Sequence, residues 1–144
     1  QILFGAFTAG LRAGLGFNTF PLMNGQLISE AATTMSPFWL NFLENGVMIQ
    51  FVHRWLGILL LLLVLLVFSM EIARGAPRRL MSICGLLATV TLVQVVLGVL
   101  TLINFVPIVL ASIHQGVACL VLLTSILLVY SIYVPARGDA DGQV

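Results

Sequence analysis

One stretch decides the fold: residues 41–73 read NFLENGVMIQFVHRWLGILLLLLVLLVFSMEIA. Its second half is an almost unbroken run of leucine and other apolar residues, and a turn signal, Arg74-Gly75-Ala76-Pro77, follows it. A helix needs about 20 apolar residues to cross the hydrocarbon core of a bilayer. The stretch therefore predicts a membrane-spanning helix.

The chain on either side of this helix carries the same kind of signal. Two further spans are expected, over about 78–105 and about 107–134, separated at Pro107 and closed by Pro135. Upstream, residues 1–13 open on an apolar run of roughly half the length of a span, which we interpret as the end of a truncated transmembrane helix. Residues 14–40 are broken by glycine, asparagine and proline and predict a loop, and residues 135–144 predict a tail. The expected fold is an all-α, integral membrane four-helix bundle whose first helix is incomplete.

The composition excludes several classes of protein. Of the 144 residues, 60% are hydrophobic and 8% are charged, and the mean hydropathy is +1.15. The lipid bilayer is therefore the expected partner of most of the surface. A net charge of +1, with no lysine, provides no basic face that could follow a nucleic-acid backbone. Cys84 and Cys119 both lie in apolar runs and are interpreted as small packing residues rather than as a disulfide.

The arginines predict the orientation. If the spans alternate in direction, Arg74, Arg78, Arg79 and Arg137 all fall on one side. The positive-inside rule places that side, and with it the tail, in the cytoplasm. Residues 14–40 then face outward, and a bacterial inner membrane is expected rather than a mitochondrial one.

Both histidines of the chain lie within spans, where an ionisable group needs a reason. His114 stands seven residues after Pro107, about 10 Å along a helix, and His53 stands at a comparable depth from the same side. Two histidines make a poor zinc site, but they complete the iron of a porphyrin, which supplies four equatorial nitrogens. The alternative is that each imidazole only bonds to a neighbouring helix.

Several neighbours of the histidines have two interpretations. Gly46, Gln50 and Gly57 share the face of His53 and leave room either for a macrocycle or for a closely packed helix. Arg54 either meets an anion such as a heme propionate or extends to lipid phosphates. A stripe of inward residues on the second complete span is interpreted as interhelical packing and hydrogen bonding; its members are Thr91, Gln94, Gly98 and Thr101.

Five segments in order resemble a known family: residues 5–14 (GAFTAGLRAG), 17–23 (FNTFPLM), 41–54 (NFLENGVMIQFVHR), 94–98 (QVVLG) and 111–115 (ASIHQ). The set is similar to the second half of heme A synthases, the bacterial and mitochondrial enzymes of oxidase assembly, and it covers nearly the whole chain. The resemblance implies a pair of four-helix bundles related by duplication, eight helices in all, which oxidise the C8 methyl of heme O to the formyl of heme A.

The resemblance also assigns residues. The family's C-terminal pair of ligands to a heme b cofactor maps onto His53 and His114, with Arg54 and Gln50 beside it. In the first bundle of the family a catalytic glutamate stands three residues before a histidine, and here that position is Gln50. An amide cannot act as a general base, so we expect no catalytic residue in this chain and an electron-transferring role for it. The implied partners are the N-terminal half of the same protein, the substrate heme O, and heme O synthase or oxidase-assembly factors.

Two other functions fit the same residues. A membrane cytochrome b subunit would relay electrons through the same histidine pair without changing any heme. A non-catalytic membrane assembly module would use the histidines only to bond across helices.

Overall fold

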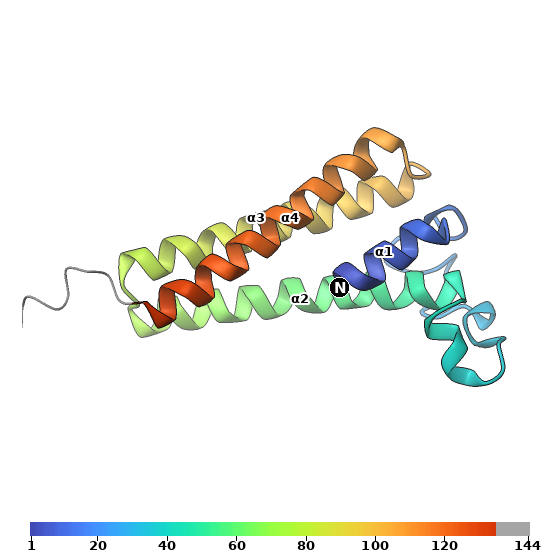
Figure 1. Cartoon of the computed structure of the whole chain (residues 1–144), viewed down its shortest axis with the longest axis horizontal. Coiled ribbons are helices and arrows are strands. Elements are labelled where there is room, and N and C mark those ends of the chain that lie inside the picture. The colour runs from blue at the N-terminus through green and yellow to red at the C-terminus, as the bar shows by residue number, and fades with distance from the viewer. Residues whose placement is uncertain (135–144) are drawn as a thin grey trace, which may run out of the picture.

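The structure is a computed structural model and describes residues 1–134. Four α-helices, α1 (Ile2–Gly10), α2 (Gly46–Arg74), α3 (Arg78–Ile103) and α4 (Ile108–Tyr133), make up the bundle in Figure 1. Three short 3-10 helices, η1 (Ala13–Leu15), η2 (Glu30–Thr33) and η3 (Phe38–Phe42), punctuate the connection between α1 and α2. The expected tail over 135–144, with Arg137, lies outside the described residues.

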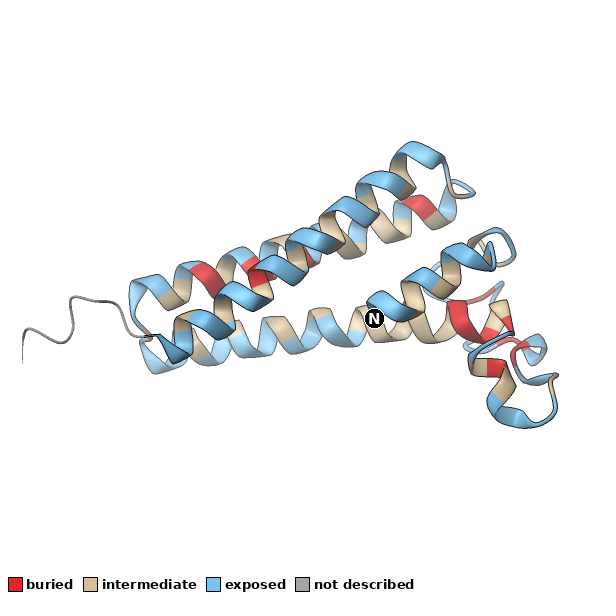
Figure 2. Cartoon of the chain, viewed as in Figure 1, coloured by how far each residue is buried: buried red, intermediate tan, exposed pale blue. Residues whose placement is uncertain are grey.

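Three of the helices, α2, α3 and α4, are long and apolar enough to cross a membrane. They have 29, 26 and 26 residues, or about 40 Å each at 1.5 Å per residue. Figure 2 shows few buried residues on them, since most are exposed or half-buried, and the exposed apolar side chains are mainly leucine, isoleucine and valine. An apolar exterior of this extent fits a lipid solvent, so the all-α membrane bundle expected from the sequence is confirmed.

The start of α2 differs from the expected position. The sequence placed it near Asn41, but residues 38–42 form η3 and the α-helix begins at Gly46. Asn45 caps it, because its side-chain oxygen accepts hydrogen bonds from the backbone N–H groups of Val47 (2.9 Å) and Met48 (3.4 Å). At the other end Gly75 adopts the left-handed conformation (φ 66°) that the Gly75-Ala76-Pro77 turn requires.

A buried pair of asparagines fixes the connection to the head of α2. Asn45 donates from its side-chain amide to Asn41 (3.0 Å) and to the carbonyl of Ala31 (2.8 Å). Asn41 is fully buried, and its amide bonds the backbone of Met35 and Phe38. These bonds replace the regular backbone pairing that an irregular segment lacks.

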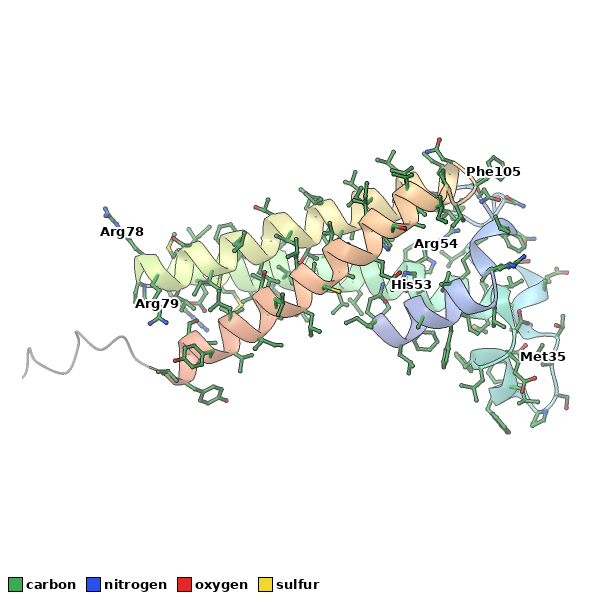
Figure 3. The ribbon with its side chains drawn as sticks, turned by 45° about the horizontal axis from the view of Figure 1, so that its top comes forward. Met35, His53, Arg54, Arg78, Arg79 and Phe105 are labelled. Carbon is green, nitrogen blue, oxygen red and sulfur yellow. The ribbon has the colours of Figure 1, made fainter. Side chains whose placement is uncertain are left out.

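The helices pack as two pairs. In Figure 1 the short α1 lies beside the first half of α2, while α3 and α4 run together and diverge from α2 toward the end that carries the loops. We call this end, with residues 11–45 and 104–107, the loop end. Asn18 ties the two pairs together there, because its side-chain amide donates to the carbonyl of Leu102 at 2.9 Å and to that of Gly14 at 2.7 Å. Figure 3 shows Arg78 and Arg79 at the opposite end, which we call the arginine end.

The two cysteines differ in environment. Cys84 on α3 is buried, as expected of a packing residue, and lines an apolar cavity of about 130 Å³ in the arginine-end half of the bundle. Cys119 on α4 is exposed, so its interpretation as a packed residue was wrong. Both thiols are free.

Candidate functional site

His53 lies against α1. It stands seven residues after Gly46, the first residue of α2, and it is in the loop-end half of the bundle (Figure 3). A Cβ placed on Gly5 of α1 would lie 3.1 Å from Cε1 of the imidazole and 3.6 Å from Nδ1. The ring therefore packs closely against the α1 backbone at Gly5. Its Nδ1 is buried and has no hydrogen-bond partner within the described residues.

His114 lies against α3 in the same manner. It stands six residues after Ile108, the first residue of α4, so both histidines are two turns inside their helices from the loop end. A Cβ on Gly98 of α3 would lie 2.9 Å from Cε1 of His114. The amide Nε2 of Gln94, one turn earlier on α3, is 3.3 Å from Nε2 of the imidazole. Nδ1 of His114 is also buried without a partner among the residues described.

Both imidazoles lie in the loop-end half of the bundle, although they come from different helix pairs, His53 from α2 and His114 from α4. Over residues 1–134 no group of three or more histidine, cysteine or carboxylate side chains could hold a metal ion by itself. Two ligands suffice only when the metal brings the others, as iron does in a porphyrin.

The polar atoms around the histidines test whether a heme fits. Besides the two Nδ1 atoms, the side-chain oxygens of Gln50 and Gln94 are buried and unpartnered in the described part of the chain. Buried polar groups without partners are rare in protein interiors, and a bound group is one explanation for them. The residues present therefore fit a bis-histidine heme, and they fit no zinc site.

Arg54 does not take one of the two roles expected for it, extension to lipid phosphates. Its side chain is 8% exposed, so it does not extend to lipid phosphates. The guanidinium instead donates to three loop carbonyls: Nη1 to Thr19 (2.9 Å) and Pro21 (2.8 Å), and Nη2 to Phe17 (3.2 Å). Its Nε is buried and makes no hydrogen bond to any described residue. Arg54 thus fastens the loop to α2 directly beside His53.

Gln50 joins this fastening, since its amide nitrogen lies 3.3 Å from the Phe17 carbonyl. The N-terminal segment packs against the two glycines on the same face of α2, Gly46 and Gly57. A Cβ on Gly46 would meet Ala13 at 3.3 Å, and one on Gly57 would meet the Gln1 side chain at 3.0 Å. Close packing is therefore the correct interpretation of these two glycines, and room for a macrocycle is not.

The inward stripe on α3 divides into two parts. Thr91 and Thr101 are buried, in keeping with interhelical packing. Gln94 and Gly98 contact His114 of α4, which is also interhelical packing and hydrogen bonding, although the sequence did not identify His114 as their partner. Gly5 was missed as a neighbour of His53 in the same way. The signal available was a glycine four residues after a glutamine, which occurs in both α1 and α3.

The sequence of this chain is similar to that of a known protein family. The protein family described as cytochrome oxidase assembly protein matches residues 1–126. The chain belongs to this family. It is 45% identical over 115 residues to the heme A synthase of Rhodospirillum centenum, covering 80% of this chain and 31% of that protein. The heme A synthase of Wolbachia pipientis wMel is 44% identical with the same coverage, and that of Bartonella henselae is 40% identical over 131 residues, 88% of this chain and 35% of the relative.

The chain spans about a third of the length of the heme A synthases that it matches. No solved structure matches the chain significantly. Family membership identifies the chain as a membrane protein of cytochrome oxidase assembly, and the resemblance seen in the sequence is confirmed. The positions of the histidines rest on the contacts described above.

Proposed function

We propose that this chain is the heme b-carrying part of a heme A synthase and that His53 and His114 are the two axial ligands. The observation that carries the proposal is the pair of half-buried imidazoles from two helix pairs, both two turns from the loop end, each with a buried and unpartnered Nδ1. A six-coordinate heme supplies one-electron transfer when bound. Family membership favours the synthase over a cytochrome b subunit that leaves heme unchanged.

The chain's own residues would hold the ligands and their surroundings. The imidazoles are held on α2 and α4 by contacts with α1 and α3. Arg54 places a buried positive charge beside His53, and the one salt bridge of the described residues, Arg74 with Glu71, lies at the arginine end. A carboxylate of the cofactor, such as a propionate, would compensate this charge and occupy the free Nε. Gln50 adds a buried side-chain oxygen that accepts no hydrogen bond from the described residues.

We further propose that oxidation of heme O takes place in the remainder of the protein. One histidine pair cannot hold a cofactor and a substrate at once, and Gln50 provides an amide at the position where a carboxylate would manage protons. The Arg74 loop would face the cytoplasm and the loop end the outer side of a bacterial inner membrane. The remaining partners would be heme O and the other proteins of oxidase assembly.

A reduced-minus-oxidised spectrum of the chain, purified from membranes in mild detergent and supplied with heme b, tests the ligand assignment. We expect one low-spin, six-coordinate heme per chain. His53→Ala and His114→Ala should each abolish that spectrum, whereas Cys119→Ala, a change at an exposed position of α4, should preserve it. A double histidine variant that kept the same low-spin spectrum would refute the proposal.

Incubation with heme O tests the division of labour. The purified chain with an electron acceptor should yield no formyl product by mass spectrometry, and the full-length protein in the same assay should yield it. Formyl product from the chain alone would place the active site at His53 and His114 instead.

A further inference from the structure

The first helix of each pair repeats one pattern. Residues 1–5 read QILFG at the start of α1, and residues 94–98 read QVVLG within α3. In both, the glycine follows the glutamine by one helical turn, so the two residues share a face. In both, the glycine meets the imidazole of the helix that follows: Gly5 meets His53, and Gly98 meets His114. The two helix pairs therefore share both the sequence pattern and the contact between a glycine and an imidazole.

The distances leave no room for a side chain at these glycines. A Cβ would lie 3.1 Å from His53 and 2.9 Å from His114, in each case nearest to Cε1. Non-bonded carbon atoms prefer about 3.5–4.0 Å. An added methyl group would therefore displace the ring. Two other helical glycines have no such constraint, since a Cβ on Gly10 of α1 or Gly116 of α4 would meet no neighbouring element within 4 Å.

The glutamines act differently in the two pairs. Gln94 touches the His114 ring itself, with 3.3 Å between the two Nε2 atoms. Gln1 donates to the backbone carbonyl of His53 at 3.0 Å and does not touch the ring nitrogens. The His114 ring is consequently held at two points, one apolar and one polar, and the His53 ring at one.

We propose that Gly5 and Gly98 are positioning residues that set the rotation of the two imidazole planes, and that Gln94 is a second, polar stop for His114. The expected effect on the heme spectrum rests on the proposed function, in which the histidines bind heme. The positioning of the two rings by Gly5, Gly98 and Gln94 does not depend on heme. Outer-shell contacts of this kind orient metal-ligating histidines and tune the metal. A rotated imidazole would alter the overlap with iron orbitals and with it the spectrum and the reduction potential.

The first arm of the test needs no heme. Because the chain has two histidines, ring-labelled histidine gives two Cε1 signals in an NMR spectrum, and each histidine variant assigns one. Gly98→Ala should shift the His114 signal and leave that of His53, and Gly5→Ala should do the reverse. Gly10→Ala and Gly116→Ala are matched controls and should move neither signal by a comparable amount. Equal shifts from the alanine variants and their controls would overturn the positioning role.

The second arm uses the heme-loaded protein. Gly98→Ala and Gly5→Ala should change the largest g value of the ferric low-spin heme and its midpoint potential, or lower heme retention, while the controls match the parent. Gln94→Leu adds no bulk at Gly98 and should shift the His114 NMR signal of the heme-free protein, in which the Gln94 amide nitrogen lies 3.3 Å from Nε2 of the ring. A parent protein without a bis-histidine spectrum would refute the proposed function, yet the first arm would still decide the positioning role.

Discussion

Replacing Arg54 should loosen the loop over the proposed site, and the size of the effect follows from its contacts. Three hydrogen bonds from the guanidinium reach the carbonyls of Phe17, Thr19 and Pro21. Bonds with a charged partner contribute roughly 1.5–3 kcal/mol each when the other group stays dry. Thr19 is exposed, so water can replace the arginine at part of this set. We therefore assign each hydrogen bond the lower value, about 1.5 kcal/mol, and count about two of the three bonds. The loop should then lose about 3 kcal/mol of local stability.

Two variants separate hydrogen bonding from charge. Arg54→Met removes the three bonds together with a charge whose burial is itself unfavourable by several kcal/mol. Arg54→Lys keeps the charge but replaces the planar fork by a single ammonium, which cannot span three carbonyls at once. Lysine should therefore be no better than methionine, although it is the conservative change.

Hydrogen exchange of the loop measures the difference. For peptides from residues 17–35, about 3 kcal/mol corresponds to roughly a hundredfold faster exchange through local opening. Arg74→Met is the matched control, because the Arg74 side chain is 64% exposed and pairs with Glu71 on the surface at 3.1 Å, an interaction of about 1 kcal/mol at most. Loop exchange in Arg54→Lys equal to that of the parent would refute the reasoning.

Three further outcomes are expected. Asn45→Ala should lower the free energy of unfolding by about 1–2 kcal/mol, measured in detergent, because the cap of α2 is lost; Asn45→Asp, which keeps the capping oxygen, should lose less. In detergent, Cys119 should react with N-ethylmaleimide at least about tenfold faster than Cys84, since one thiol is exposed and the other buried; equal rates would contradict the packing of α3. A cysteine at Asn18 should be labelled by an impermeant reagent from the outer side of the membrane and one at Gly75 should not, and the opposite pattern would invert the orientation.

The membrane spans could be predicted from the sequence because lipid imposes one simple demand. Every backbone group must bond within its own segment, so a long apolar run becomes a helix whatever its neighbours are. The start of α2 did not follow from that rule. Asn41 and Asn45 both favour turns and caps, and only the 3-10 turn over residues 38–42 shows that the helix begins after the second asparagine.

The hydrogen-bond partners of Arg54 could not be predicted from the sequence, because they are backbone carbonyls and not side chains. Backbone carbonyls leave no signature in a sequence, and those of Phe17, Thr19 and Pro21 point at one guanidinium only after the loop has folded back over 33 to 37 residues. Hydropathy and charge could indicate that an arginine in a span needs a partner. They could not indicate that the partner is the loop itself.

The glycines at the two histidines connect the fold to the proposed function. A bundle that uses one histidine from each of two helix pairs must hold two rings at matching depth and angle, although the pairs meet mainly through the loop end and α2–α3 packing. Repeating a glutamine and a glycine one turn apart on α1 and α3 provides each ring with its own local support. The ring angle then depends on contacts within a pair and not on the spacing between pairs. In the proposed heme site, small movements between the two helix pairs would leave each imidazole plane in the orientation that its own helix pair sets.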